Sequence, residues 1–256
     1  MAVPGCGSAA HYCQDNGAGH STLAQERGDT SMRQLLDNIM WHALSGPHAR
    51  FAIGTSEVRR YAPGFSPIVG FADAGRPDFA ALAAYCVPGE RFYCTGWSGV
   101  VPAGWRVDLE STIVRMVWQG DQPVADEAPE AALLGPAHLL AALALVELTQ
   151  PGPFASRTME LGDYFGCFDG DRLLAMAGER MHAGDLREIS AVCTHPAAQG
   201  RGLARRLMLK LIRRQMLRGE TPFLHVMHDN HGARRLYERM GFRDHQQAVV
   251  RVVSLC

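Results

Sequence analysis

The sequence lacks a cysteine motif, a long apolar run and an excess of charge of either sign. Its seven cysteines are scattered and never spaced C-x-x-C, which argues against a disulfide framework and favours reduced thiols in a cytoplasmic protein. The net charge of −1 gives no reason to expect nucleic acid or an anionic membrane as partner. No apolar run is long enough to span a membrane, and the N-terminus lacks the basic start and apolar stretch of a secretory signal.

Large apolar side chains are also rare in residues 1–32, where Gly, Ala, Ser and polar residues dominate. Such a segment cannot bury enough surface to offset the entropy of ordering, so we expect a disordered leader, with Met32 as an alternative start of translation. The leader contains Cys6, His11, Cys13 and His20. Their spacing matches no zinc pattern, so we expect no metal site.

Residues 33–128 indicate an N-terminal α/β domain without a chemical motif. A helix is expected over 34–44, where Ser45-Gly46-Pro47 ends it, and a second over 79–87. Strand-like runs are found at 49–54, 66–72, 91–95 and 107–118. The acidic, proline-containing stretch 120–129 is the best candidate for a linker.

Residues 129–256 indicate a second domain with a clearer pattern, in the order helix, antiparallel meander, helix, strand, helix, strand. Hairpin turns at Asp169-Gly170-Asp171 and Ala183-Gly184-Asp185 join the meander. Leu203, Leu207 and Leu211 form an apolar stripe at helical spacing. The expected elements are 136–149, 163–168, 172–181, 186–194, 203–217, 222–228, 230–240 and 249–255. The fold class is therefore a mixed α/β sheet protein.

A glycine-bearing turn over 199–204 separates an expected strand from the helix that begins at Leu203. A helix N-terminus and the outward N–H groups of such a turn form an anion site, and the absence of Cβ at Gly200 and Gly202 allows close approach. The Lys-Ser/Thr of a P-loop is missing, which argues against that type of nucleotide site.

Basic side chains at Arg201, Arg205 and Arg206 surround the start of this helix, where the helix dipole disfavours cations. They are explained by a bound anion or, alternatively, by a solvated basic face that continues along the helix through Lys210 to Arg218. The sequence leaves both explanations open.

Two signatures then carry a family resemblance: Gln199-x-x-Gly202-x-Ala204, and a downstream set consisting of Asn230, Ala233, Leu236-Tyr237 and Gly241-Phe242. Over residues 130–256 the chain resembles the GNAT superfamily of N-acyltransferases, and more loosely its glycine N-acyltransferase branch. The resemblance implies acetyl-CoA or another acyl-CoA as co-substrate, with no metal. The donor would contact Val192, Cys193, Thr194, Gln199, Gly200, Arg201, Gly202, Leu203, Ala204, Asn230 and Ala233.

Acyl transfer to an amine needs a proton acceptor for the ammonium and a proton donor for the leaving thiolate. By resemblance, Tyr237 is the candidate general acid, and Glu188, eleven residues before Gln199, is the candidate base. A water chain, Glu179, His182 and His228 remain alternatives for the base. Cys193 as a covalent nucleophile is a further alternative to direct transfer.

The sequence thus predicts an enzyme that transfers an acyl group, most simply acetyl, to an amine in a ternary complex. A non-catalytic acyl-CoA-binding regulatory module is the alternative. The expected acceptor is a small-molecule or peptide amine. We expect its pocket to be formed by the first helix, the loop around 151–157 and the C-terminal strand. A homodimer stays open, and we expect the N-terminal half to be a degenerate second GNAT-like unit.

Overall fold

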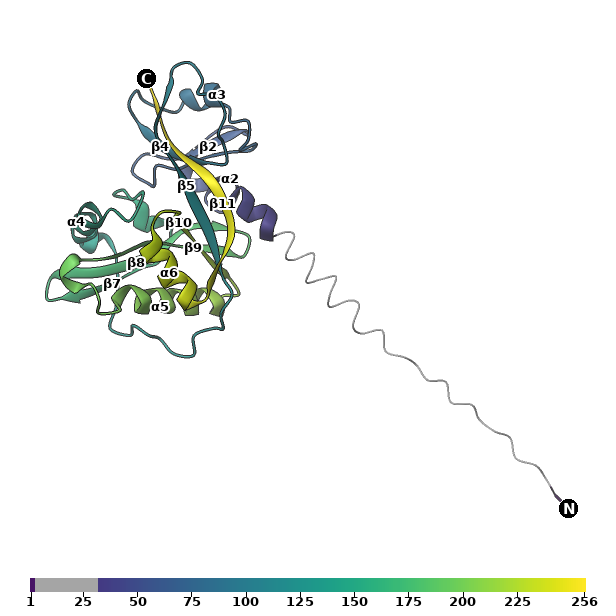
Figure 1. The fold of residues 1–256 in the computed structure, drawn as a ribbon, viewed down its shortest axis with the longest axis vertical. Coiled ribbons are helices and arrows are strands. Elements are labelled where there is room, and N and C mark those ends of the chain that lie inside the picture. Colours follow the sequence, from purple (N-terminus) through teal and green to yellow (C-terminus); the bar gives the residue numbers. More distant parts are fainter. Residues whose placement is uncertain (3–31) are drawn as a thin grey trace.

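The computed structural model describes residues 1–2 and 32–256 (Figure 1). Nearly all of the leader expected over 1–32 therefore lies outside the described residues, and so do Cys6, His11, Cys13 and His20. In the described part of the chain, no helix is long and apolar enough to cross a membrane.

A small sheet and two short helices open the described chain. Residues 32–37 are helical and lead into α2 (Ile39–Ser45). Next come η1 (Ala49–Phe51) and the antiparallel strands β1 (Ala52–Gly54), β2 (Val58–Tyr61) and β3 (Val69–Phe71). The short helix α3 (Phe79–Ala83) follows, where the Asp78 side chain accepts a hydrogen bond from the Ala81 N–H and so caps it.

A single mixed sheet of eight strands, ordered β4-β11-β5-β10-β9-β8-β7-β6, forms the rest of the framework. Its strands are β4 (Arg91–Thr95), β5 (Trp105–Trp118), β6 (Ala132–Leu133), β7 (Tyr164–Asp169), β8 (Arg172–Ala183), β9 (Leu186–Thr194), β10 (Thr221–Met227) and β11 (Phe242–Leu255). The β9–β10 pair is parallel, whereas the other paired neighbours are antiparallel.

Helices cover both faces of this sheet (Figure 1). On one face, α5 (Leu203–Leu217) buries its leucine stripe with Val114, Met116 and Leu224 of the sheet, and α6 (His231–Met240) adds Tyr237. The opposite face packs against α2 near Val117 and Phe223. Further along, α4 (Leu139–Thr149) packs on β8 and β9. The 3₁₀ turns η2 (Pro136–His138), η3 (Thr158–Leu161) and η4 (Pro196–Ala198) complete the fold.

The main sheet is continuous across the expected domain boundary at 128/129, because β4 and β5 precede that boundary and still pair with β11. β5 also pairs with β10, so it lies inside the sheet. A degenerate second GNAT-like unit in the N-terminal half is not confirmed. That half instead supplies two strands to the main sheet, together with the three-stranded sheet β1-β2-β3.

Candidate active site

The parallel strands β9 and β10 separate to form a fork. Their pairing begins at Leu186 and Thr221 and ends at Ile189 and Leu224, although β9 continues to Thr194 and β10 to Met227. Each strand is still held by its outer neighbour, since β9 pairs with β8 and β10 pairs with β5 beyond this point. Backbone N–H and C=O groups on the inner edges are therefore free to pair with a ligand between the strands.

A bulge in β9 accompanies the fork. Ala191 has φ +51°, a left-handed conformation that is uncommon for a residue with a side chain. The register with β8 shifts here, because two residues lie between Ser190 and Cys193 on β9 whereas one lies between Met176 and Gly178 on β8. An extra residue bends a strand and increases its twist, so this bulge turns β9 away from β10.

The glycine turn after β9 presents free donors at the N-terminus of α5. Gly202 is the N-cap of α5 with φ +72°, and no side chain caps the helix there. Within the described residues, the backbone N–H groups from Gly200 to Ala204 have no hydrogen-bond acceptor. Together with the helix dipole, these donors make the turn suitable for an anion.

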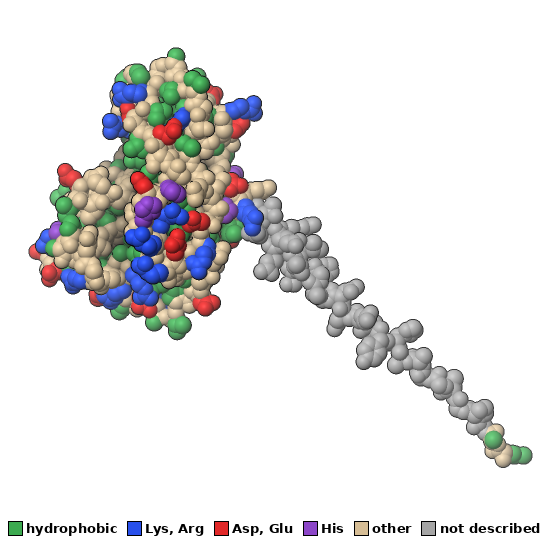
Figure 2. All heavy atoms as spheres, viewed as in Figure 1, with side chains coloured by type: hydrophobic (Ala, Val, Ile, Leu, Met, Phe, Trp, Pro, Cys, Tyr) green, Lys and Arg blue, Asp and Glu red, His purple; other side chains and the backbone are tan. Residues whose placement is uncertain are grey.

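Most of the basic side chains along α5 are already engaged with the protein. Arg206, Lys210 and Arg213 bind carbonyl or carboxylate oxygens in the segment 124–130, and so fasten the expected linker to the helix. Arg201 and Arg205 make no ion pair with the described residues, and both are exposed. On the face shown in Figure 2, basic side chains gather over the region of α5 and α6. The middle of the basic stripe is therefore structural, whereas Arg201 and Arg205 at its start are exposed and available to a bound anion or to solvent.

A cavity of about 630 Å³ occupies the fork. Its wall includes these residues expected from the sequence: Glu188, Val192, Cys193, Thr194, Gln199, Asn230, Ala233 and Tyr237. Gly200, Arg201, Gly202, Leu203 and Ala204 follow Gln199 directly but do not line the cavity. The side-chain oxygen of Asn230 accepts a hydrogen bond from the Ala233 N–H at 3.1 Å, so its first role is to cap α6.

Tyr237 reaches the fork from α6. The residue is 8% exposed and lines the cavity, and no acceptor in the described part of the chain binds its hydroxyl. Burial, with a smaller contribution from Cys193, raises the pKa of Tyr237 to about 12, so the hydroxyl keeps its proton at neutral pH. Burial also raises the pKa of Cys193 to about 11, which leaves its thiol protonated and a poor nucleophile.

Comparison with a solved structure identifies the family. A crystal structure from Novosphingobium aromaticivorans, assigned to the GNAT family of acetyltransferases, is 35% identical to this chain and superimposes with a TM-score of 0.80. The match covers 86% of this chain and 98% of that chain. The chain belongs to the GNAT family.

Other comparisons agree with this assignment over shorter or more distant matches. The FR47-like protein family model matches residues 164–252. A mycothiol acetyltransferase from Gordonia bronchialis is 38% identical over 79 residues, which is 30% of this chain and 26% of that relative's length. A GCN5-related N-acetyltransferase from Kribbella flavida shares the fold, with 16% identity and a TM-score of 0.58 over 85% of this chain and 95% of that chain.

Glu188, the candidate proton acceptor from the sequence, lies on β9 where this strand is still paired with β10. The side chain is 1% exposed and pairs with the Arg180 guanidinium at 2.7 and 2.9 Å. It also accepts hydrogen bonds from His225 Nδ1–H and from the Met181 N–H. Burial alone would raise the pKa of Glu188, but the charge of Arg180 and the bonds from His225 and Arg180 outweigh it and lower the pKa to about 2. Such a carboxylate holds a proton poorly at neutral pH.

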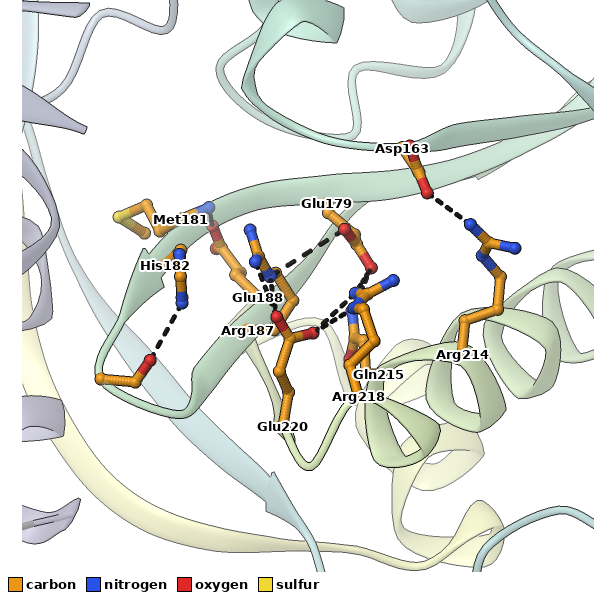
Figure 3. A network of polar contacts seen from close by, with 11 residues as sticks. Asp163, Glu179, Met181, His182, Arg187, Glu188, Arg214, Gln215, Arg218 and Glu220 are labelled. Carbon is orange, nitrogen blue, oxygen red and sulfur yellow. Dashed lines mark hydrogen bonds and ion pairs between the residues drawn. The ribbon is translucent and has the colours of Figure 1, made fainter. Parts of the chain in front are cut away.

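The other candidate bases lie away from the fork. Glu179 is buried in a network with Gln215, Arg187 and Arg218 that ties β8 and β9 to the end of α5 (Figure 3). His182 bonds the Gly184 carbonyl at the β8–β9 hairpin. The side chains of Glu179, His182 and the exposed His228 do not line the cavity within the described residues.

Sequence reasoning missed the basic partners of Glu188. Arg180, on β8, and His225, on β10, line the cavity, and Arg115 of β5 donates its Nε–H to His225 Nε2. Burial lowers the pKa of His225, so its ring is neutral and bridges Glu188 and Arg115. No motif in the sequence marks these residues. Only the strand order brings them together.

Proposed function

We propose that this protein transfers an acetyl group from acetyl-CoA to a primary amine by direct attack in a ternary complex. The single observation that carries the proposal is the fork between β9 and β10, which adjoins the uncapped N-terminus of α5. An extended strand edge next to an anion site matches a ligand with an amide-bearing arm and a pyrophosphate. The tyrosine hydroxyl at the fork supports catalysis over the alternative of a non-catalytic acyl-CoA-binding module.

The donor would bind through backbone groups. We expect Val192, Cys193 and Thr194 to pair with the amides of the pantetheine arm, and the N–H groups from Gly200 to Ala204 to bind the pyrophosphate. Arg201 and Arg205 lie at this turn without an ion pair among the described residues, and they add positive charge for the phosphates. The loop following α4, from 150 to 153, closes the other side of the cavity.

The reaction balances with the groups at the fork. The neutral amine attacks the thioester carbonyl carbon, the C–S bond breaks, and the amide and the free CoA thiol form. The amine nitrogen loses one proton and the sulfur gains one, so the reaction has no net uptake or release of protons. We propose that Tyr237 donates a hydrogen bond to the departing sulfur and supplies its proton, and that water in the cavity takes up the amine proton and reprotonates the tyrosine oxygen.

Glu188, proposed from the sequence as the base, is better suited to a positioning role. Its carboxylate holds Arg180 and His225 at the base of the fork, and its low pKa disfavours proton uptake.

The test of the function is release of free thiol from acetyl-CoA in the presence of a broad panel of amines. We expect thiol release that depends on the amine, and a product heavier than the amine by one acetyl group in mass spectrometry. Tight acetyl-CoA binding by calorimetry with no thiol release from any amine would instead establish the binding module.

Gly202→Val should weaken acetyl-CoA binding by about 100-fold, the loss expected when several charge-assisted bonds to one anion are disturbed. Valine disfavours the positive φ of +72° at Gly202, and its side chain would stand over the donors of the turn. Calorimetric titration with acetyl-CoA measures the effect. Gly104→Val is the matched control, because Gly104 has φ +82° and a Cβ added there would meet only open space, yet the residue lies outside the cavity. Equal affinity in both variants would contradict the placement of the pyrophosphate.

Two finer predictions accompany this function. The glycine N-acyltransferase branch stays a prediction, so glycine belongs in the amine panel. The five described cysteines are unpaired thiols, which supports a reducing compartment such as the cytoplasm.

A further inference from the structure

The cavity extends beyond the fork to a region that the donor's contacts do not use. Its wall there is apolar or aromatic, and consists of Met40, Ile68, Tyr93, Leu109, Ile113 and Val250. Tyr93 and Leu109 both stand in register with Val252 of β11, so their side chains lie on one face of the sheet. We call this part of the wall the apolar end. It is built by α2, the connection before β3, and the strands β4, β5 and β11.

The apolar end offers no free carboxylate. Glu188 is the one carboxylate that lines the cavity among the described residues. Its two oxygens accept two bonds from Arg180, one from His225 and one from the Met181 N–H. A carboxylate has about four acceptor positions, so all of them are filled. An ammonium group on the far end of an acceptor would find no partner here.

A buried guanidinium, that of Arg115, lies beneath this end. Arg115 is 1% exposed, and its donors bind neutral acceptors: His225, Thr95, Gln246 and the Asp37 carbonyl. Arg180 is balanced by Glu188, whereas Arg115 has no carboxylate in contact among the described residues. The Asp37 carboxylate itself is 56% exposed and faces His245. Asp37 and Glu188 are close enough to act on the Arg115 charge, so the carboxylates near this end already have cationic partners. A second cation entering here would lose hydration without gaining a free carboxylate.

These three features select an acceptor. Building on the acyl transfer proposed above, we propose that the acceptor is a primary amine on an apolar body with no second positive charge, such as an alkylamine or arylalkylamine. The attacking amine would lie at the fork and its hydrocarbon body would lie against Tyr93, Leu109 and Ile113.

A homologous series tests this proposal. With purified full-length protein and acetyl-CoA, we expect kcat/KM to rise about fourfold per methylene from propylamine to hexylamine, the effect of burying one CH₂ group. Hexylamine should exceed 1,5-diaminopentane, which has nearly the same length and a second ammonium, by about 100-fold or more. Phenethylamine should be a good acceptor, and glycine, glutamate and spermidine poor ones.

A substitution that should reduce the preference for the monoamine provides a second test. Leu109 is 48% exposed, so Leu109→Asp should fold, and its carboxylate would supply the missing partner for a second ammonium. The ratio of kcat/KM for hexylamine over 1,5-diaminopentane should fall at least about tenfold, the scale of one new charge pair. Leu140→Asp is the matched control, because Leu140 is 81% exposed on α4 and does not line the cavity. Its ratio should stay unchanged.

The outcomes separate this inference from the function on which it depends. Thiol release that is flat across the alkylamine series, or fastest with the diamine, glycine, glutamate or spermidine, overturns the acceptor class and leaves acyl transfer in place. An unchanged ratio in Leu109→Asp overturns the placement of the acceptor. Absence of thiol release with every amine overturns the proposed function, and the acceptor class with it.

Discussion

Replacing Glu188 with glutamine should lower the free energy of unfolding by about 3–5 kcal/mol, the cost of breaking a buried ion pair. Glu188 and Arg180 have side chains that are 1% and 8% exposed, so water cannot replace the lost partner. The variant would leave the charges of Arg180 and Arg115 in the interior with no carboxylate between them. Urea unfolding followed by circular dichroism at pH 7 measures the loss.

The same carboxylate should make stability depend on pH in the acid range. Its pKa is about 2 in the folded protein, below its ordinary value of 4.5. A depressed pKa means that the folded state binds the proton less readily than the unfolded state, so the stabilisation is complete above about pH 4.5 and is lost as the pH falls toward 2. The Glu188→Gln variant should lack this component, and its stability should fall less between pH 5 and pH 3, as unfolding curves at these pH values would show.

A matched control is available on the surface. Glu130 pairs with Arg206, and the two side chains are 51% and 35% exposed, so Glu130→Gln should cost less than about 1 kcal/mol. If Glu188→Gln kept full stability while kcat fell and the acid limb of the pH–rate profile disappeared, Glu188 would be the catalytic base and the positioning role would be wrong.

The second large effect is expected at Tyr237. Tyr237→Phe should lower kcat by about 10²-fold, because the departing thiolate would lose its proton donor. The phenyl ring keeps the packing against Phe242, whose ring centroid lies 6.1 Å away. The dissociation constant of acetyl-CoA should therefore stay near the wild-type value. Steady-state kinetics with the best amine and calorimetry with acetyl-CoA separate the two quantities.

Tyr164 provides the control for loss of a tyrosine hydroxyl. It is fully buried, does not line the cavity, and its hydroxyl has no hydrogen-bond partner among the described residues. Tyr164→Phe should leave kcat unchanged, because no bond is lost. A similar fall of kcat in both variants, or weakened acetyl-CoA binding with normal kcat in Tyr237→Phe, would contradict the role of Tyr237 as the acid.

Local sequence signals predicted most of the elements. The bounds of α5 and β4 agree with the expected 203–217 and 91–95, since a leucine stripe ended by Gly219 and a short aromatic-containing run are strong local patterns. β11 was expected at 249–255 but begins at Phe242. Its polar first half is a strand because it pairs with β5 along a long register, which local pattern does not encode. The missed strand β2 reads Val-Arg-Arg-Tyr and likewise depends on its neighbours.

The proposed donor site is likewise encoded locally. Gln199, Gly202 and Ala204 lie in one turn, and Asn230 and Tyr237 lie in one helix, so their spacing along the chain fixes their spacing in space. The rest of the cavity wall was predictable only in part: Met40, residues 151–153 and Val250 belong to the three segments expected to shape an acceptor pocket. Tyr93, Leu109 and Ile113 lie far ahead of the motifs in the chain and meet them only because β5 inserts between β11 and β10.

By itself, therefore, the sequence indicated the family and proposed the anion turn and the candidate acid, because each is encoded within a short stretch of chain. The tertiary structure alone decided that the N-terminal strands belong to the main sheet, that Glu188 is paired with Arg180 and hydrogen-bonded by His225, and that the far end of the cavity is apolar with no free carboxylate. Those properties arise from strand order and burial, which bring together residues that no local pattern connects.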